Sequence, residues 1–369
     1  MEHQDGTFRS YLEEKGGVEQ PPVVDPNAVA RFKNRKRKQK VLTAKDYVQG
    51  ICSGNRTLLS QAITIIESNL QEHYELAQEI ITECLPFSGN SIRIGITGVP
   101  GAGKSTFIES FGKYITQKKH TLAVLAIDPS SERTKGSILG DKTRMVELSV
   151  DENAYIRPSP SAGSLGGVAR KTRETIILCE AAGFDVIFVE TVGVGQSETA
   201  VHSMVDFFLL LMLAGAGDEL QGIKRGIMEM ADSISITKAD GSNIDKAKVA
   251  RSEYQTALSL FPPHPSGVTQ KVTVCSALEK TGLSEIWKII EEYVSTTKHA
   301  GFFEEKRNQQ AKYWMYESIH EQLQRNFYSS PKIKKHLAAT EQKVIQQQKS
   351  SFVAAQELLD IYFQYKEKS

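Results

Sequence analysis

The sequence contains few cysteines and no long apolar segment. Its 369 residues include only 4 Cys, which lie far apart and form no Cys-x-x-Cys pair, so neither a zinc site nor a disulfide framework is predicted. The longest apolar run, Phe207 to Ala216, is too short to span a bilayer. The N-terminus lacks the apolar core of a signal peptide, and its first five residues are too acidic for a typical mitochondrial transit peptide. These absences favour a cytoplasmic protein that does not bind membranes.

An excess of charge of either sign is also missing. The chain has 45 Lys and Arg against 44 Asp and Glu, a net charge of +1, so no overall field attracts nucleic acid. The 40% hydrophobic and 24% charged residues are typical of a folded soluble domain. The exception is the basic run from Arg31 to Lys40, within a predicted disordered tail of residues 1–41. Such a run is either an arm for an acidic partner or a solvated tail.

A glycine-rich loop follows the first predicted strand. Ile92, Ile94 and Ile96 alternate as in a buried strand, and the next eight residues, GVPGAGKS, match the phosphate-binding P-loop pattern. Glycines let such a loop turn its N–H groups toward phosphate oxygens. We expect Lys104 to reach the β- and γ-phosphates and the Ser105 hydroxyl to bind Mg²⁺. The predicted nucleotide-binding residues of the loop are Gly98, Val99, Pro100, Gly101, Ala102, Gly103, Lys104, Ser105 and Thr106.

Strand and helix patterns alternate over residues 91–298. The predicted strands are Ile92–Thr97, Leu122–Ile127, Ala154–Arg157, Val186–Glu190, Phe207–Leu213, Ser233–Thr237 and Lys271–Cys275. Predicted helices between them include Lys171–Ala182, Ile244–Leu260 and Leu283–Thr297. Short apolar strands that alternate with helices predict an α/β fold of the P-loop NTPase type, with a mainly parallel sheet covered by helices. Ligands then bind at the carboxyl ends of the strands.

Helical regions flank this domain on both sides. In residues 42–90, one face carries apolar residues at helical spacing, namely Leu58, Leu59, Ala62, Ile63, Ile66 and Leu70. Residues 299–369 form a predicted helical extension with two stripes, first Tyr316, Ile319, Leu323 and Phe327, then Ala355, Leu358, Leu359 and Tyr362. The sequence Ser329-Ser330-Pro331 separates the two helices. These stripes need a partner surface, either on the same domain or on a second subunit.

Three carboxylates are candidates for holding magnesium. Asp128 and Glu190 each stand at the end of a predicted strand, and Asp141 lies in a loop between them. Mg²⁺ prefers oxygen ligands and is usually held by one or two carboxylates plus phosphate. The predicted metal ligands are therefore Ser105, Asp128, Asp141 and Glu190.

The residues after Glu190 are similar to a switch element of GTPases. Gly193 follows Glu190 by three residues, and in GTPases a glycine amide at this spacing senses the γ-phosphate. The usual first residue of that element is Asp, so Glu190 is a departure. Gln196 is a candidate for orienting the attacking water. Lys104, Glu190 and Gln196 are thus candidate catalytic residues.

Two further loops point to guanine. Thr237-Lys238-Ala239-Asp240 resembles the Asn-Lys-x-Asp motif, whose Asp accepts two hydrogen bonds from guanine, with Thr237 in place of Asn. Ser276-Ala277-Leu278 resembles the later GTPase loop whose backbone contacts the guanine oxygen. Both follow predicted strands and stand in the expected order after the P-loop. We expect Thr237, Lys238, Asp240, Ser276, Ala277 and Leu278 to form the base site of bound GTP or GDP.

Taken together, five segments resemble the ArgK/MeaB family of G-protein chaperones, which is associated with cobalamin-dependent methylmalonyl-CoA mutase. They are the P-loop, Ala126–Ser131, Gly136–Met145, Glu190–Glu198 and Gly215–Lys224, and the resemblance extends from about residue 45 to the C-terminus. It implies a P-loop GTPase core, homodimerisation through the C-terminal part, and GTP hydrolysis that gates cofactor loading or protection of an acyl-CoA mutase. By position, it assigns Lys104, Ser105, Asp128, Asp141 and Glu190 to phosphate and magnesium, and Asp240 to the base.

Residues 215–232 form a candidate switch for the partner protein. Three glycines make its first part easy to move, and it carries Lys224 and Arg225, cations that a partner could swing toward charge on the γ-phosphate. Lys224 is therefore a fourth candidate catalytic residue. The alternative is a plain loop with solvated cations.

Other functions are compatible with a P-loop core. A kinase would not need the guanine motif around Asp240. A metallochaperone GTPase for nickel enzymes would use His- or Cys-rich sites, whereas the 8 His of this chain are scattered. A non-enzymatic scaffold that is gated by the bound nucleotide would hydrolyse GTP only very slowly. The sequence favours the GTPase chaperone, with an acyl-CoA mutase and a second copy of the chain as its partners.

Overall fold

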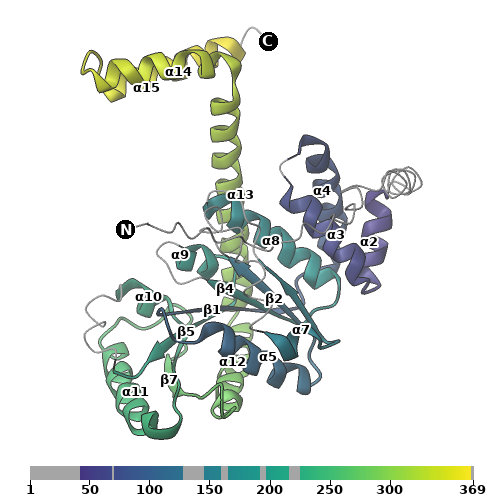
Figure 1. The fold of residues 1–369 in the computed structure, drawn as a ribbon, viewed down its shortest axis with the longest axis vertical. Coiled ribbons are helices and arrows are strands. Elements are labelled where there is room, and N and C mark those ends of the chain that lie inside the picture. Colours follow the sequence, from purple (N-terminus) through teal and green to yellow (C-terminus); the bar gives the residue numbers. More distant parts are fainter. Residues whose placement is uncertain are drawn as a thin grey trace, which may run out of the picture. The chain divides into compact units, whose positions relative to one another are not determined.

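A seven-stranded parallel sheet forms the centre of the fold (Figure 1). The computed structural model of this chain describes residues 42–68, 70–127, 145–158, 165–191, 197–215 and 225–366. The strands are β1 (Ile92–Gly98), β2 (Leu122–Ile127), β3 (Ala154–Arg157), β4 (Val186–Thr191), β5 (Phe207–Leu213), β6 (Ser233–Thr237) and β7 (Lys271–Val274). Their order is β3-β2-β4-β1-β5-β6-β7, and all neighbouring pairs are parallel.

All the predicted strands are present, which confirms the α/β prediction. β2, β3, β5 and β6 have the predicted ends, β1 and β4 each extend by one residue, and β7 ends one residue early at Val274. The strands are nearly continuous apolar runs because both faces of the sheet are covered. In β5, for example, the residues from Phe207 to Met212 are all buried.

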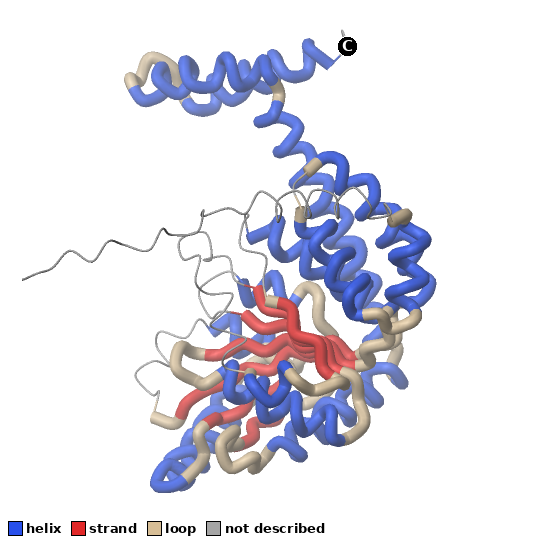
Figure 2. Tube along the Cα trace, turned by 45° about the vertical axis from the view of Figure 1, so that its right-hand side comes forward, coloured by secondary structure: helices blue, strands red, loops and turns tan. Residues whose placement is uncertain are grey.

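Helices cover both faces of the sheet, as Figures 1 and 2 show. On one face, α5 (Lys104–Gln117) and α12 (Leu283–His299) enclose a core that includes Ile94, Phe111 and Trp287. On the other face, α8 (Leu165–Ala181) contacts β2, and α9 (Ser197–His202) contacts β1 and β4. α11 (Ile244–Leu258) packs on β6 and β7. The short helices are η1 (Leu85–Phe87), α7 (Val146–Ser149), α10 (Arg225–Met230) and η2 (Gly241–Asn243).

Several predicted helix ends differ from the structure: α8 ends at Ala181 instead of Ala182, α11 at Leu258 instead of Leu260, and α12 at His299 instead of Thr297. The largest difference is at the start of α8. α8 begins at Leu165, whereas the sequence predicted a start at Lys171. The first turn of α8 contains Gly166 and Gly167, and a helical glycine costs about 1 kcal/mol relative to alanine. The next residues, Val168 and Ala169, are 1% and 0% exposed, so tertiary burial of this turn outweighs the local preference.

Among the described residues, three α-helices precede the sheet and pack against one another and against α8. They are α2 (Ala44–Cys52), α3 (Arg56–Glu67) and α4 (Gln71–Cys84). The predicted stripe is buried at Leu59, Ala62, Ile63 and Ile66, but Leu70 is 61% exposed because it lies between α3 and α4. The predicted disordered tail, residues 1–41, lies outside the described residues.

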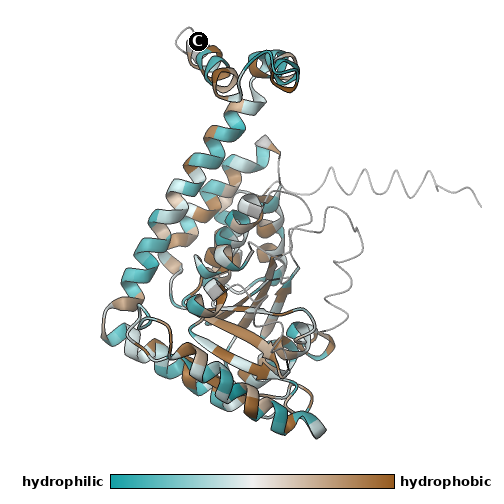
Figure 3. Ribbon diagram, turned by 90° about the vertical axis from the view of Figure 1, so that its left-hand side faces the viewer, coloured by the Kyte–Doolittle hydropathy of each residue, from teal (hydrophilic) through white to brown (hydrophobic). Residues whose placement is uncertain are grey.

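The C-terminal extension consists of α13 (Phe302–Ser329), α14 (Pro331–Ile345) and α15 (Ser351–Lys366), with the predicted break at Ser330. Leu358 and Tyr362 are buried with Ile333 and pack against Phe327. By contrast, three members of the first predicted stripe, namely Tyr316, Ile319 and Leu323, are 57%, 46% and 55% exposed. In Figure 3 the apolar residues concentrate in the sheet, and most of α13 is hydrophilic. The isolated chain therefore leaves much of this stripe uncovered.

All four cysteines are free; Cys84, Cys179 and Cys275 are buried, and Cys52 is exposed. Within the described ranges, no helix combines the length and the apolar character needed to cross a membrane.

Candidate functional site

The P-loop joins β1 to α5 at the carboxyl edge of the sheet. The Val99 N–H donates to the Leu211 carbonyl of β5 at 3.2 Å. A Cβ at Gly98 would lie 2.5 Å from that same oxygen, so no side chain fits there. Gly101 and Gly103 have φ angles of +79° and +81°, the left-handed region that glycine adopts without strain. The loop is thus shaped by backbone requirements of the kind that phosphate binding exploits.

Lys104 stands in the first turn of α5 and points back over the loop. Its Nζ donates to the Gly98 carbonyl at 3.0 Å. Burial lowers the pKa of Lys104, while the nearby carboxylates of Glu190 and Glu198 act in the opposite direction. The start of a helix also favours anions, because its first N–H groups lack partners within the helix. A half-buried cation at a helix start is suited to phosphate oxygens.

The residues available for magnesium include Ser105 and Glu190. Ser105 is partly exposed at the start of α5, and Glu190 is 8% exposed in β4, in register with Ile96 of β1 and Ala126 of β2. Hydroxyl and carboxylate oxygens at one sheet edge fit Mg²⁺, which prefers few protein ligands and completes its shell with phosphate and water. The other two predicted ligands, Asp128 and Asp141, lie outside the described residues. In the described ranges, no group of three or more His, Cys, Asp or Glu is arranged to hold a metal ion.

Three more predicted residues, Gly193, Gln196 and Lys224, also lie outside the described residues. The structure describes the end of β4 before Gly193 and the start of α9 after Gln196. The Thr191 hydroxyl donates to the Thr97 hydroxyl of β1 at 2.8 Å, which ties the end of β4 to the strand that leads into the P-loop.

Glu198 was given no role in the sequence analysis. It lies in the first turn of α9, is 4% exposed, and is close enough to Lys104 to act on its charge. The only signal in the sequence was its position at the end of the Glu190–Glu198 segment.

Thr237 is turned toward the P-loop. It ends β6, is 2% exposed, and its hydroxyl donates to the Ala102 carbonyl at 2.8 Å, with the Met212 carbonyl at 3.2 Å. The sequence analysis treated Thr237 as a base-binding residue that replaces Asn. The structure instead places its hydroxyl on the phosphate-binding loop, so that β6 braces Ala102.

Asp240 and Ser276 meet at the end of β6 and β7. The Ser276 hydroxyl donates to the Asp240 carboxylate at 2.6 Å, and the Ala239 N–H donates to the Cys275 carbonyl at 3.0 Å. The Asp240 side chain is therefore oriented while one of its oxygens stays available. An oriented carboxylate can accept two N–H bonds from guanine, whereas adenine has no matching pair of donors.

The remaining base-site residues surround this pair. Lys238 is exposed, has φ +56°, and its aliphatic chain passes over Gly103. Ala277 is held by the Ser110 hydroxyl of α5, which donates to its carbonyl at 2.7 Å, and Leu278 is 75% exposed. Ser110 was missed by sequence reasoning because its contact joins positions 167 residues apart. The structure thus gathers Lys104, Ser105, Glu190, Thr237, Asp240 and Ser276 at one edge of the sheet.

The chain matches a described protein family over most of its length. Residues 59–332 match the family described as "Methylmalonyl Co-A mutase-associated GTPase MeaB". This range includes the P-loop, the Thr237–Asp240 motif and the Ser276 loop.

Individual relatives are also similar over most of the chain. "Probable GTPase Mb1533" of Mycobacterium bovis is 47% identical over 320 residues, 86% of this chain and 95% of the relative. "Methylmalonic aciduria type A homolog, mitochondrial" of Mus musculus is 47% identical over 306 residues, 80% of this chain and 74% of the relative. A solved structure described as a "LAO/AO transport system kinase" matches with a TM-score of 0.70 and 35% identity, covering 88% of this chain and 99% of that one.

Proposed function

The chain belongs to the MeaB family of methylmalonyl-CoA mutase-associated GTPases, and we propose that it couples GTP hydrolysis to loading or protection of the cobalamin cofactor of an acyl-CoA mutase. Methylmalonyl-CoA mutase is the proposed partner, and the cytoplasm is the proposed location. The relative from mouse, whose name refers to methylmalonic aciduria, supports the mutase assignment.

The observation that carries the GTPase activity is the Asp240–Ser276 pair beside the P-loop. A P-loop alone binds several nucleotides, but an oriented carboxylate at the end of β6 recognises the two N–H donors of guanine. The 2.6 Å hydrogen bond from Ser276 holds that carboxylate in place. A kinase of this fold would have no need for this pair.

Each described residue then has a proposed role in hydrolysis. Lys104 neutralises charge on the β- and γ-phosphates, and the N–H groups of the P-loop hold their oxygens. Ser105 and Glu190 would hold Mg²⁺, whose charge assists the departure of the diphosphate. The sequence supports further proposed roles. Gln196 orients the attacking water, Gly193 senses the γ-phosphate, and Lys224 is a cation that the partner controls. Asp128 and Asp141 are further metal ligands.

The test combines turnover with cofactor loading. The purified chain is incubated with GTP, GDP or a non-hydrolysable GTP analogue, and cobalamin transfer to the apo form of a purified methylmalonyl-CoA mutase is followed by absorbance. We expect the mutase to raise the GTPase rate, and hydrolysable GTP to give a loading yield that GDP does not. Equal loading with all three nucleotides would contradict the proposal.

The same assay separates the alternatives. One solved relative is described as a kinase, so ³²P from γ-labelled GTP and ATP is followed into acceptors as well as into free phosphate. Label in an acceptor molecule would favour a kinase. Nickel-dependent turnover would favour a metallochaperone.

We also propose that the chain forms a homodimer through the exposed stripe of α13. Ile319 and Leu323 are 46% and 55% exposed in the isolated chain, so burial of the remaining surface of each contributes about half the value for a whole side chain, or roughly 1 kcal/mol. The double variant Ile319→Arg, Leu323→Arg should be monomeric in sedimentation equilibrium. Gln324→Arg, at an exposed polar position of the same helix, should leave the mass unchanged.

A further inference from the structure

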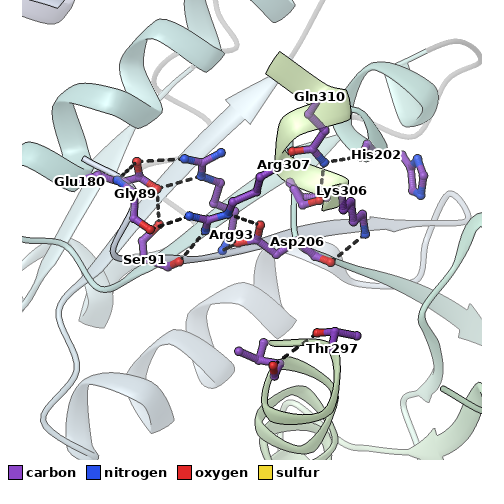
Figure 4. A network of polar contacts seen from close by, with 12 residues as sticks. Gly89, Ser91, Arg93, Glu180, His202, Asp206, Thr297, Lys306, Arg307 and Gln310 are labelled. Carbon is purple, nitrogen blue, oxygen red and sulfur yellow. Dashed lines mark hydrogen bonds and ion pairs between the residues drawn. The ribbon is translucent and has the colours of Figure 1, made fainter. Parts of the chain in front are cut away.

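α13 binds the end of α9 through two uncharged donors. Gln310 Nε2 donates to the carbonyl oxygens of Val205 at 2.8 Å and His202 at 3.4 Å, as Figure 4 shows for Gln310 and His202. Trp314 Nε1 donates to the carbonyl oxygen of Ser203 at 3.0 Å. Gln310 and Trp314 are 6% and 8% exposed. His202 is the last residue of α9, and Ser203 and Val205 lie in the connection to β5, so α13 holds the end of α9 mainly through the segment that follows it.

Two cations anchor the same stretch of α13 to the sheet (Figure 4). Lys306 Nζ donates to the Asp206 carbonyl at 2.7 Å, and Arg307 binds both carboxylate oxygens of Asp206 at 2.8 and 2.7 Å. Arg307 also donates to the Ser91 carbonyl, just ahead of β1, at 2.7 Å. The start of α13 is therefore fixed to the beginnings of β1 and β5, and its next turn holds α9.

The other end of α9 faces the nucleotide site. α9 contacts β4 and β1 beyond the point where Thr191 binds Thr97 ahead of the P-loop, and Glu198 in its first turn is 4% exposed. The Glu198 carboxylate also opposes the lowering of the Lys104 pKa by burial. Between the two ends, α9 packs closely on β1, since a Cβ at Gly95 would lie 2.9 Å from Val201 Cγ1. A helix of 6 residues is about 9 Å long. This short helix thus lies between α13 and β1, the strand that leads into the P-loop.

We propose that Gln310 and Trp314 are positioning residues for GTP hydrolysis, which hold α9 so that Glu198 faces Lys104. The proposal rests on the GTPase function above. The second half of the same helix carries the exposed residues Tyr316, Ile319 and Leu323. This half of α13 is the proposed dimer contact, so the helix that holds α9 also meets the second copy of the chain.

Two mild variants test this role. Gln310→Ala removes the amide, and Trp314→Phe keeps an aromatic ring but removes the N–H donor. Since each deletes a neutral hydrogen bond that orients α9, we expect kcat to fall about 3- to 10-fold. The Kd for GDP should change by no more than about 2-fold, because the base and phosphate contacts stay intact. The matched control is Gln309→Ala, an exposed neighbour whose amide donates to Glu305 of the same helix.

A second control addresses general loss of stability. Thr297→Val removes a buried 2.7 Å hydrogen bond to the Tyr293 carbonyl inside α12, which does not contribute to α9. If Thr297→Val lowers Tm as much as Gln310→Ala or Trp314→Phe does, it should still keep the wild-type kcat. A decrease in kcat that follows Tm in all variants would overturn the positioning role.

A double-mutant cycle shows whether the effect passes through Glu198. If it does, Trp314→Phe should lower kcat by about 2-fold or less in a Glu198→Gln background, because the residue it positions has already lost its charge. Independent, multiplicative effects would overturn the proposed route. A wild-type chain that does not hydrolyse GTP would overturn the proposed function itself, whereas a wild-type rate that both variants retain would overturn only the positioning role.

Discussion

The Thr237 hydroxyl donates a 2.8 Å hydrogen bond to the carbonyl oxygen of Ala102, and this contact joins the strand that leads to the base site with the loop that binds phosphate. The two residues are 135 positions apart in the sequence. The strand that leads to the proposed base site therefore supports the proposed phosphate-binding loop through a direct hydrogen bond.

Removal of this hydroxyl should weaken nucleotide binding without changing base preference. Thr237→Val keeps the shape but leaves the buried Ala102 carbonyl with a poorer set of donors, at a cost of about 1–2 kcal/mol. We expect calorimetry to show GTP affinity about 5- to 30-fold lower and the GTP-to-ATP ratio unchanged. Thr237→Ser, which retains the donor, should restore most of the affinity. If Thr237→Val binds GTP as tightly as the wild type, the hydrogen bond between Thr237 and Ala102 does not contribute to nucleotide binding.

Asp240 should determine the preference of the site for guanine over other bases. A carboxylate that accepts two guanine N–H bonds contributes about 1.5–3 kcal/mol for each charge-assisted bond. In Asp240→Asn, the amide N–H₂ faces the guanine amino group, so GTP affinity should fall about 100-fold, while xanthosine triphosphate, with an oxygen at that position, should bind better.

The comparison uses competition of GTP, ATP and xanthosine triphosphate for one labelled nucleotide. Asp245→Asn is the matched control, because Asp245 is 94% exposed at the start of α11 and forms a surface ion pair with Lys248. Equal displacement by GTP and ATP in the wild type would refute base reading by Asp240.

Lys104→Ala should remove tight binding of GTP. The phosphates would lose a charge-assisted hydrogen bond, which corresponds to about 10- to 150-fold in affinity. Lys118→Ala, at the C-terminal end of the same helix, should bind GTP normally. Unchanged calorimetric affinity in Lys104→Ala would contradict the P-loop assignment.

Stability should fall in mild acid because of His202. Burial, helped by nearby Lys306, lowers the pKa of His202 to about 4, although Asp232 acts in the opposite direction. Below about pH 6.5 the unfolded chain takes up a proton at this residue and the folded chain does not until about pH 4. The free energy of unfolding should therefore drop by up to about 2 kcal/mol between pH 7.5 and pH 5 from this residue.

Urea unfolding at the two pH values measures this loss. His202→Gln should reduce the pH dependence by that amount, and His299→Gln, exposed at the end of α12, should leave it unchanged. The pKa of His264 is also lowered, mainly by burial, so part of the wild-type loss should persist in His202→Gln. A pH dependence identical in both variants would show that His202 is protonated equally in the two states.

The sequence by itself determined the elements and the nucleotide motifs. Strands that are buried on both faces must be almost entirely apolar, so runs such as Phe207–Leu213 could be located from their composition. The P-loop pattern is equally local, because its shape depends on glycines at fixed spacing, of which Gly101 and Gly103 adopt positive φ. The start of α8 could not be found in this way, since burial of Val168 and Ala169 overrides the helix-breaking tendency of Gly166 and Gly167.

Only the tertiary structure decided which distant groups meet. The hydroxyl of Thr237 turns to Ala102, Ser110 holds Ala277, and Gln310 reaches Val205 across 105 residues. No local pattern encodes such contacts, because a polar side chain bonds whichever buried partner the packed elements bring within about 3 Å of it. The same holds for exposure: a helical stripe is identical in sequence whether its own chain covers it or not, and only the packed chain showed that Ile319 and Leu323 stay uncovered.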